Sequence, residues 1–394
     1  MKADNNVKLR ADRVWLTSDA CDLDEFVRHT GRKTTRDDCP LAAEIVSNVP
    51  IYDGDAIRDS SKDPEARRAL MAEWAEAMLT GPGIVVFRKA YSDPAPVDAA
   101  TEIFNTIIAE QHAGNSGGGD HFAKPGANDR VWNALEKLCL RAPEVFAAYY
   151  ANVSVAMASQ AWLGTGYQMT SQINVVNPGG AAQSAHRDYH MGFQSAEEIS
   201  KFPAHAHRLS PVMTLQGAIA HCDMPIESGP TLFLPFSQTF EPGYFAYRRP
   251  EFARYFDERH VQLPLAKGDA VFFNPALFHA AGHNRTTSVK RMANLLQVSS
   301  AYGRAMESVD RVKMAKALYP ALLETRTLSA GERANAVAAC AEGYAFPTNL
   351  DRDPPLGGLA PQTQQQLMLN ALAENLDPSA FGAALDRRAW SRLT

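Results

Sequence analysis

Several features that mark particular classes of protein are missing from this chain of 394 residues. Its five cysteines are scattered and form no CxxC pair. That pattern argues against a disulfide framework or a cysteine-rich metal site and is typical of a reducing compartment. No run of five or more like charges occurs, and the net charge is −5. We therefore expect neither nucleic acid nor an anionic membrane as a partner, because both attract clustered Lys and Arg.

Long hydrophobic runs are missing as well. The least polar stretch, residues 148–164, contains Asn152, Ser154 and Gln160, and it is too short and too polar to span a membrane. The first residues, MKADNNVKLRADRVW, have no apolar segment after their basic residues, so we expect no secretory signal. These observations predict a soluble, cytoplasmic protein.

The composition is that of an ordinary globular protein. Hydrophobic residues make up 45% and charged residues 21%, and a chain of this length can bury a core without disulfides. We expect a single domain, 1–394, built from a mainly helical N-terminal part (1–165), a β core (166–300) and a helical C-terminal extension (301–394). Residues 1–62 are polar and irregular, and we expect them to form an arm over the main body.

Helical periodicity dominates on both sides of the β core. Leu70, Trp74 and Met78 recur at helical spacing within 63–80, and a Gly-Pro-Gly stop follows at 81–83. IVVF at 84–87 is typical of a short buried strand. Further helices are expected at 97–112, 130–141, 144–163, 304–325, 329–343, 361–375 and 378–391.

From residue 168 the pattern changes to period-two alternation with frequent turns. Turns such as Pro178-Gly179-Gly180 and Lys267-Gly268-Asp269 punctuate it. Many short strands of this kind indicate a sandwich or barrel. The strands are expected at 171–177, 211–221, 231–235, 260–265, 269–274 and 291–299.

A candidate metal site lies inside this β core, in the sequence AQSAHRDYH. Residues two apart on a strand point the same way, so His186 and Asp188 can present an imidazole and a carboxylate to one ion. His279 follows an apolar strand directly, in AKGDAVFFNPALFHAAGHN, which suggests a side chain that faces a cavity. The three residues would form a 2-His-1-carboxylate face, the ligand set of non-haem iron(II) oxygenases.

Other histidines offer rival sites. His186 and His190 are four apart and would share a helix face, as zinc ligands do. The Pro-Gly-Gly turn upstream argues against a helix there. His205 and His207 form a second pair, but FPAHAHRLSP has the composition of a loop. His221 ends an apolar strand and is expected to be a hydrogen-bonded core or cavity residue.

Three blocks in order then resemble the phytanoyl-CoA dioxygenase family of Fe(II)/2-oxoglutarate-dependent oxygenases. They are NPGGAAQSAHRD, with a Pro-Gly, a Gln and His-x-Asp; ESGPTLFLPFSQTF at 227–240; and HAAGHNRTTSVKR at 279–291. Together they span about 180–295, and the remainder of the chain matches only in being helical. The resemblance implies a double-stranded β-helix, a cupin-like jelly-roll with flanking helices. It also implies that His186, Asp188 and His279 hold iron.

The same resemblance implies the site of 2-oxoglutarate. The family's basic residue follows the distal His by eleven positions, which is Lys290 here, with Arg291 next. We favour Arg291, because Arg clamps a carboxylate bidentately whereas Lys acts as a point charge. Thr231 matches a threonine that can hydrogen-bond the same carboxylate, or it packs in the core. Gln183 and Gln172 are further candidates for the co-substrate site.

Two departures from the family pattern bear on these contacts. The family's Pro-Gly-Ser-His is Pro235-Phe236-Ser237-Gln238 here, and the small polar residue often found two positions after the distal His is Ala281. Neither removes an iron ligand.

The implied reaction uses Fe(II), 2-oxoglutarate and O2, and it oxidises an unactivated C–H bond with release of succinate and CO2. The product could arise by hydroxylation, desaturation or cyclisation. Two other functions stay open, a cupin-like metal-dependent hydrolase or isomerase and a non-catalytic binding protein on an oxygenase fold.

The substrate is expected to be a small metabolite, such as an amino acid or an intermediate of secondary metabolism, and a homodimer is left open. The glycine-rich segment 114–119, which leads to His121, is either an ordinary flexible loop or a mobile edge of the site. Candidate pocket residues, each with a core or surface role as the alternative, are Gln172, Asn174, Tyr189, His190, Phe193, Thr214, Gln216 and the loop with His121.

Overall fold

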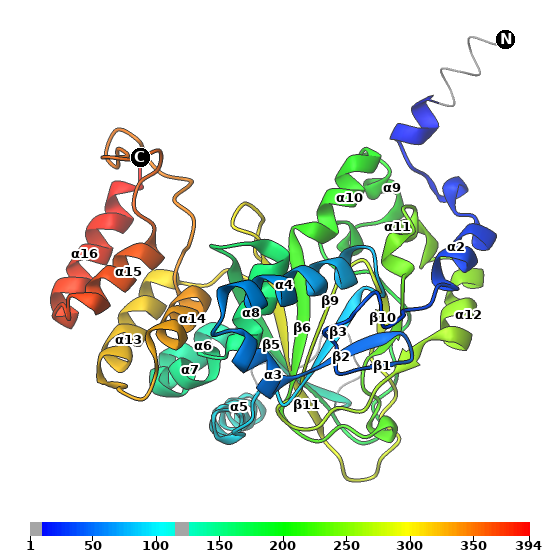
Figure 1. The fold of residues 1–394 in the computed structure, drawn as a ribbon, viewed down its shortest axis with the longest axis horizontal. Helices are drawn as coiled ribbons and strands as arrows, with labels where there is room; N and C mark the ends of the chain where they lie inside the picture. The colour runs from blue at the N-terminus through cyan, green and yellow to red at the C-terminus, as the bar shows by residue number, and fades with distance from the viewer. Residues whose placement is uncertain (1–9, 115–125) are drawn as a thin grey trace.

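The computed structural model describes residues 10–114 and 126–394. Within these residues a large sheet and a small sheet face each other, and helices cover them from outside (Figure 1). In order across the large sheet, the strands are β1 (Glu44–Val46), β2 (Val49–Asp53), β3 (Ile84–Arg88), β9 (Ala270–Phe273), β6 (Thr214–Ala220), β11 (Arg291–Ser299), β5 (Gln168–Val176) and β4 (Asn128–Val131). The small sheet contains, in order, β10 (Phe278–Ala280), β7 (Leu232–Leu234) and β8 (Val261–Gln262).

β11 shows how the sequence builds the large sheet. It pairs antiparallel with β5 on one side and β6 on the other. Alternate residues from Arg291 to Gln297 line the space between the sheets, whereas Met292, Leu296 and Val298 belong to the core beneath the helices. Both faces of the strand are therefore covered; the outer face is apolar except for Asn294, which donates to the hydroxyls of Tyr149 and Tyr150, and the inner face is mixed.

The two sheets meet across a shared apolar core. Phe233 of β7 packs edge-on against Phe273 of β9, with ring centroids 5.0 Å apart, and Val86 and Val271 belong to the same cluster. An extended segment adds to the edge of the small sheet where His186 forms an antiparallel bridge with His279 of β10. This arrangement is the double-stranded β-helix, or jelly-roll, and the fold predicted from the sequence is confirmed.

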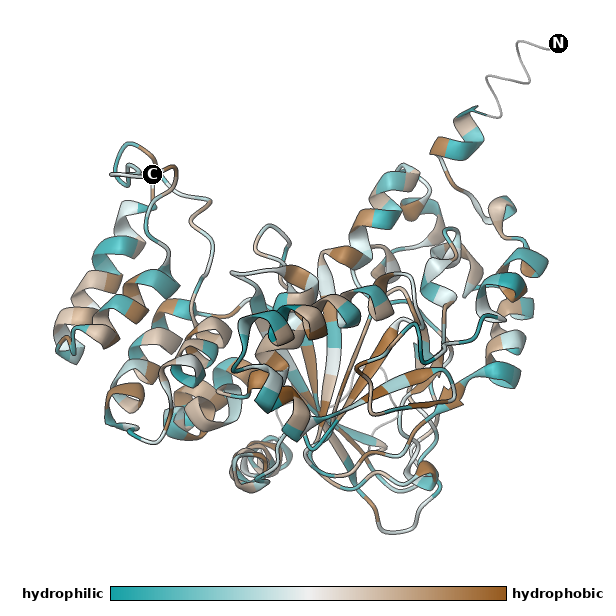
Figure 2. Cartoon of the chain, viewed as in Figure 1, coloured by the Kyte–Doolittle hydropathy of each residue, from teal (hydrophilic) through white to brown (hydrophobic). Residues whose placement is uncertain are grey.

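Helices flank the two sheets at both ends of the molecule. Figure 2 shows hydrophobic residues along the central strands and alternating with hydrophilic ones around the helices, as amphipathic packing requires. Local signals fix several helix starts. Asp63 caps α4 (Pro64–Leu79) ahead of Pro64, and Ser329 with Glu332 forms a capping box on α14 (Ala330–Cys340).

The helices next to the large sheet are α3 (Gly54–Ser60), α4 (Pro64–Leu79), α5 (Ala95–Ala113), α6 (Ala134–Arg141), α7 (Pro143–Tyr150) and α8 (Val153–Leu163). The C-terminal helices are α13 (Arg311–Glu324), α14 (Ala330–Cys340), α15 (Gln364–Ala373) and α16 (Pro378–Ser391). At the opposite end lie α2 (Leu23–Thr30), α9 (Ala196–Ile199), α10 (Ala204–Val212), α11 (Gly243–Ala246) and α12 (Pro250–Arg259) (Figure 1). Within residues 10–114 and 126–394, no helix is both long and apolar enough to cross a membrane.

The structure differs from the predicted elements at several places. The N-terminal part supplies four strands to the large sheet, of which only 84–87 was predicted, and residues 1–62 include β1, β2, α2 and α3 rather than an irregular arm alone. Residues 204–212, which were predicted to be partly loop and partly strand, form α10. The predicted helix 144–163 is two helices, α7 and α8.

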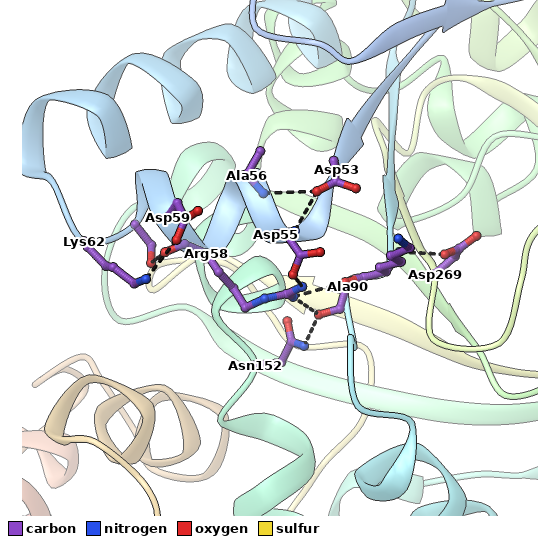
Figure 3. A network of polar contacts seen from close by, with 11 residues as sticks. Asp53, Asp55, Ala56, Arg58, Asp59, Lys62, Ala90, Asn152 and Asp269 are labelled. Atoms are coloured by element: carbon purple, nitrogen blue, oxygen red, sulfur yellow. Dashed lines mark hydrogen bonds and ion pairs between the residues drawn. The ribbon is translucent and has the colours of Figure 1, made fainter.

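A polar network joins segments of the N-terminal part to one another and, through the amide of Lys89 and Oδ1 of Asp269 (2.8 Å), to the β core (Figure 3). Asp53 caps α3 through the amides of Asp55 and Ala56, and Arg58 of the same helix donates to the carbonyl of Ala90 at 3.2 Å. Asn152 at the start of α8 donates to that same carbonyl at 2.8 Å. These contacts hold the end of β3 in place, and β3 in turn pairs with β9 beside the site described below.

Candidate active site

Three potential metal ligands meet where the two sheets open. One ligand atom from each of His186, Asp188 and His279 lies within 4.8 Å of the others. His279 belongs to β10, and reciprocal backbone hydrogen bonds of 3.0 and 3.2 Å join it to His186. The amide of Asp188 donates to the carbonyl of Pro275 at 3.1 Å, which continues the extended pairing. The predicted alternation therefore places His186 and Asp188 on one side of an extended segment.

Both imidazoles are held in the same way, with Nδ1 against a backbone carbonyl and Nε2 facing the centre of the triad. Nδ1 of His186 lies 2.9 Å from the carbonyl of Ser184, and Nδ1 of His279 lies 2.8 Å from the carbonyl of Leu277. A carbonyl only accepts, so each Nδ1 carries the proton and each Nε2 offers its lone pair to the centre of the triad. Backbone carbonyls orient metal-binding histidines in this way in many proteins.

The carboxylate of Asp188 faces both imidazoles and accepts a hydrogen bond from one amide. Oδ2 lies 3.3 Å from Nε2 of His279, Oδ1 lies 3.6 Å from Nε2 of His186, and Gln216 of β6 donates from Nε2 to Oδ2 at 2.5 Å. Burial by itself would raise the pKa of Asp188, but His279, His186 and Gln216 together lower it below its ordinary value. The residue is an anion at neutral pH, as a ligand of a divalent cation must be.

His186 is suited to the same role. Burial and the neighbouring His279 lower the pKa of His186, and Asp188 opposes them only in part. Its imidazole is therefore neutral at neutral pH, the form that binds a metal. Within the described part of the chain, no other group of three His, Cys, Asp or Glu side chains converges in this way.

The triad opens into a cavity of about 410 Å³ between the sheets. Its sheet wall is the inner face of β3, β9, β6, β11 and β5, and residues of β7 and β10 line the opposite side. Three alanines of the large sheet, Ala218, Ala220 and Ala293, leave room in this wall. The volume is in the usual range for a site that takes small molecules.

Arg291 lines the cavity and is the better of the two basic candidates. It is 6% exposed, and its guanidinium donates at 3.4 Å to the carbonyl of Gly282. No carboxylate among the described residues forms an ion pair with it. Burial lowers the pKa of Arg291 to about 10, so it stays charged at neutral pH. Lys290 is exposed and does not line the cavity.

The other predicted site residues divide into two groups. Tyr189 and His190 do not line the cavity; Tyr189 is buried, and Nδ1 of His190 lies 3.2 Å from Oγ of Ser210. Thr214 is likewise buried outside it, and His121 falls outside the described residues. Those that do line the cavity are Gln172, Asn174, Gln183, Phe193, Gln216 and Thr231.

The rival histidines have structural roles. Nε2 of His207 lies 3.0 Å from the carbonyl of Ile199, and the residue is buried in α10. His221 is buried between Oγ1 of Thr101 and the hydroxyl of Tyr149, each at 2.8 Å. The expectation of a hydrogen-bonded core histidine is confirmed.

Sequence reasoning missed many of the lining residues, among them three with amide or guanidinium side chains. Gln297 follows Arg291 by six positions on β11, so the period-two pattern contained the signal that would have found it. Arg130 lies on β4, a stretch predicted to be the start of a helix. Arg187 stands between two triad residues, and its guanidinium donates to the carbonyls of Ser237 and Phe240. Neither arginine carried a sequence signal.

A family model now accounts for these features together. The model of the phytanoyl-CoA dioxygenase (PhyH) family matches residues 65–293, which is more than half of the chain. The chain belongs to the phytanoyl-CoA dioxygenase family. Enzymes of this family use Fe(II), 2-oxoglutarate and O2, and a 2-His-1-carboxylate triad that leaves coordination positions open fits that metal and co-substrate. The chain is thus an oxygenase-type enzyme dependent on Fe(II) and 2-oxoglutarate.

Solved structures show more distant similarity. The chain is 17% identical to SnoN, a non-haem α-ketoglutarate-dependent epimerase of nogalamycin biosynthesis, over 61% of this chain and 82% of SnoN, with a TM-score of 0.38. It is 19% identical to the carbocyclase SnoK of the same pathway, over 58% of this chain and 83% of SnoK (TM-score 0.39). AviO1 from Streptomyces viridochromogenes Tue57 is 18% identical, over 59% of this chain and 97% of AviO1 (TM-score 0.42). No curated protein matches the chain. Similarities at this level carry no information on reaction or substrate.

Proposed function

We propose that this enzyme oxidises an unactivated C–H bond of a small metabolite and converts 2-oxoglutarate to succinate and CO2. His186, Asp188 and His279 would hold the iron through two Nε2 atoms and one carboxylate. The observation that carries the proposal is the convergence of these three ligand atoms within 4.8 Å at the mouth of a cavity that also contains a buried arginine.

Arg291 is proposed to bind the far carboxylate of 2-oxoglutarate. Its guanidinium is charged, buried and free of ion pairs with the described acidic residues. Thr231 lines the same cavity and can donate a hydrogen bond to that carboxylate. The small side chains of Ala218, Ala220 and Ala293 leave space for the aliphatic part of the co-substrate.

When bound, the iron and 2-oxoglutarate supply the oxidising power, and the protein supplies orientation and shielding. Gln216 keeps the Asp188 carboxylate in one orientation, and the two backbone carbonyls keep each histidine in one tautomer. The apolar wall around Val271 and Phe273 limits bulk water near the site. Hydroxylation, desaturation and cyclisation are all compatible with this geometry.

Removal of one triad ligand tests the proposal. Asp188→Ala and His279→Ala should each lower succinate formation at least about 100-fold, because each removes a metal ligand. Circular dichroism should stay unchanged, because the two sheets are held by their own core. His283→Ala, an exposed histidine four residues from His279, is the matched control and should keep full activity. An Asp188→Ala or His279→Ala enzyme that turned over near the wild-type rate would refute the assignment.

A further inference from the structure

The cavity wall carries a stripe of carboxamide side chains that the proposed function leaves unexplained. Gln216 lies on β6, Gln297 on β11, and Gln172 and Asn174 on β5, which are adjacent strands of the large sheet. Gln297 pairs directly with Gln216 across the two strands. We call these four residues the amide stripe. Buried amides are costly to place in a core unless they are hydrogen-bonded, so a cluster of four calls for a reason.

The stripe adjoins the part of the wall proposed for 2-oxoglutarate, since Asn174 pairs with Ala293 across β5 and β11. Toward Arg291 the same strands present Ala218, Ala220 and Ala293. The inner face therefore has an apolar region on β6 and β11 that ends at Arg291, and a polar region formed by Gln216 and Gln297 at the other end of these two strands and by the neighbouring residues of β5. Gln172, a candidate from the sequence both for the co-substrate site and for the substrate pocket, belongs to the polar region.

Hydrogen bonds fix how the stripe presents its atoms. Gln216 donates from Nε2 to Asp188. Gln172 donates from Nε2 to Oε1 of Gln297 at 3.0 Å and accepts at Oε1 from Nη1 of Arg130 at 3.1 Å. Because its oxygen is used, Gln297 has its Nε2 left as a donor for the cavity.

Two acceptors of the stripe are left without partners. Oε1 of Gln216 and Oδ1 of Asn174 are both buried, and neither has a hydrogen-bond partner among the described residues. An unsatisfied buried acceptor of this kind costs about 1–3 kcal/mol. The stripe thus presents two acceptors and one donor, and a hydroxyl group is the ligand that both donates and accepts at one atom.

The charges around the stripe disfavour ionic ligands. Asp188 is the one acidic residue among the described residues that line the cavity, and it is assigned to the metal. No second carboxylate there could pair with a substrate ammonium. The guanidinium of Arg187 is turned into the protein, where it lies over the ring of Tyr244. Arg130 lies over the ring of Trp132, and its Nη1 donates to Gln172 within the wall.

Apolar side chains lie beside the polar stripe. Trp132, Phe193 and Met306 line the cavity together with the amides. Aromatic faces next to carboxamides suit a ligand with a hydrocarbon ring or chain on one side and hydroxyl groups on the other.

We propose that the amide stripe is the subsite for the primary substrate, and that this substrate is a neutral, polyhydroxylated molecule with a ring skeleton. The inference rests on the proposed function, because the substrate must lie beside the iron ligands. Gln216 would join the two parts, since its amide touches both Asp188 and the subsite.

Matched probes test the substrate class on the full-length enzyme. The probes are phenyl β-glucoside, phenyl β-glucuronide, phenyl β-glucosaminide and cyclohexylbenzene, which share two six-membered rings and differ in charge and hydroxyl groups. Each is added to the anaerobic Fe(II)–2-oxoglutarate enzyme while the visible absorption band is followed, and then to the aerobic enzyme while succinate is measured. We expect the glucoside to shift the absorption band and to stimulate succinate formation at a concentration at least about tenfold lower than the other three probes require.

Variants of the stripe complete the test. Asn174→Leu and Gln297→Met keep side-chain volume but remove hydrogen-bonding groups, so each should abolish the advantage of the glucoside while the absorption band still forms. Gln168→Met, on β5 but outside the cavity, is the control and should keep that advantage.

The failures of the two proposals are distinguishable. A wild-type enzyme that forms no band with Fe(II) and 2-oxoglutarate contradicts the proposed function itself. When the band forms normally, three results would overturn the substrate inference and leave the proposed function intact. These are no response to the glucoside, an equal or stronger response to a charged or hydroxyl-free probe, and an advantage that survives in both stripe variants.

Discussion

Gln216 illustrates how a single side chain supports the proposed metal site. It does not belong to the triad, yet its amide donates the shortest hydrogen bond that Asp188 makes, 2.5 Å, and so restricts which carboxylate oxygen faces the centre. Partners of this kind orient the ligand and are often as important as the ligand itself.

Gln216→Leu should weaken Fe(II) binding by about 10- to 100-fold, because Asp188 loses its orienting donor. Anaerobic Fe(II) titration by equilibrium dialysis would measure this. Gln297→Met is the matched control. Gln297 of β11 pairs with Gln216 of β6, and its side chain hydrogen-bonds Gln172 rather than Asp188. Equal iron affinity in wild-type and Gln216→Leu proteins would mean that the hydrogen bond has no role in metal binding.

Arg291, which lines the cavity, and its exposed neighbour Lys290 make a matched pair of basic residues for a test of the co-substrate site. Arg291→Ala should raise the concentration of 2-oxoglutarate needed for half-maximal turnover by about 30- to 1000-fold, which corresponds to about 2–4 kcal/mol for a buried, charge-assisted pair. Lys290→Ala should change it less than about twofold, because Lys290 is exposed. Steady-state kinetics with varied 2-oxoglutarate would decide the matter, and a crippled Lys290→Ala enzyme would reverse the assignment.

Among elements, those with a clear local pattern were predictable. β11 alternates over nine residues and β5 over a similar length, so both appear close to where the sequence placed them. β10 is three residues long and buried on both faces, so it has no alternation to detect. β4 is polar in sequence and becomes a strand only by pairing with β5, which is a tertiary effect.

The same distinction applies to the site. His186, Asp188 and His279 could be proposed because ligand chemistry restricts residue type and spacing. Arg130 could not, because its place beside Gln172 depends on β4. Tyr189 and His190 were predicted to lie in the pocket, but they do not line it. The backbone turns at both residues with positive φ, 60° and 42°, and carries them away from the cavity.

His221 connects three elements, since it follows β6 and is held by Thr101 of α5 and Tyr149 of α7. Burial lowers the pKa of His221 from 6.5 to about 3, with Asp98 opposing it. Between those pH values the unfolded chain binds a proton that the folded chain does not, so stability falls as pH falls below 6.5.

The expected contribution of His221 is a loss of about 2 kcal/mol in the free energy of unfolding between pH 8 and pH 5. Urea unfolding at several pH values in this range would measure the loss. The free energy of unfolding should fall more steeply with falling pH in the wild type than in His221→Gln. His205→Gln, at an exposed position, should leave the slope of the wild type unchanged. Parallel pH profiles for the wild type and His221→Gln would contradict the idea of a neutral buried imidazole.

At the scale of the whole molecule, we propose that residues 1–394 form one domain. A continuous core cluster includes Trp74 from the N-terminal part, Leu296 from β11, and Leu318 and Phe381 from the C-terminal helices. The sheets carry the proposed chemistry between them, and the helices bury the outer face of the large sheet.

The central claim is that the triad binds Fe(II) and that 2-oxoglutarate then joins it in the same cavity. An anaerobic titration followed by visible absorption tests it most directly. We expect a weak charge-transfer band that requires both Fe(II) and 2-oxoglutarate, saturates at one equivalent of each, and disappears in Asp188→Ala but not in His283→Ala. A wild-type protein that binds Zn(II) or Mn(II) at the triad yet gives no band with Fe(II) and 2-oxoglutarate would contradict the account.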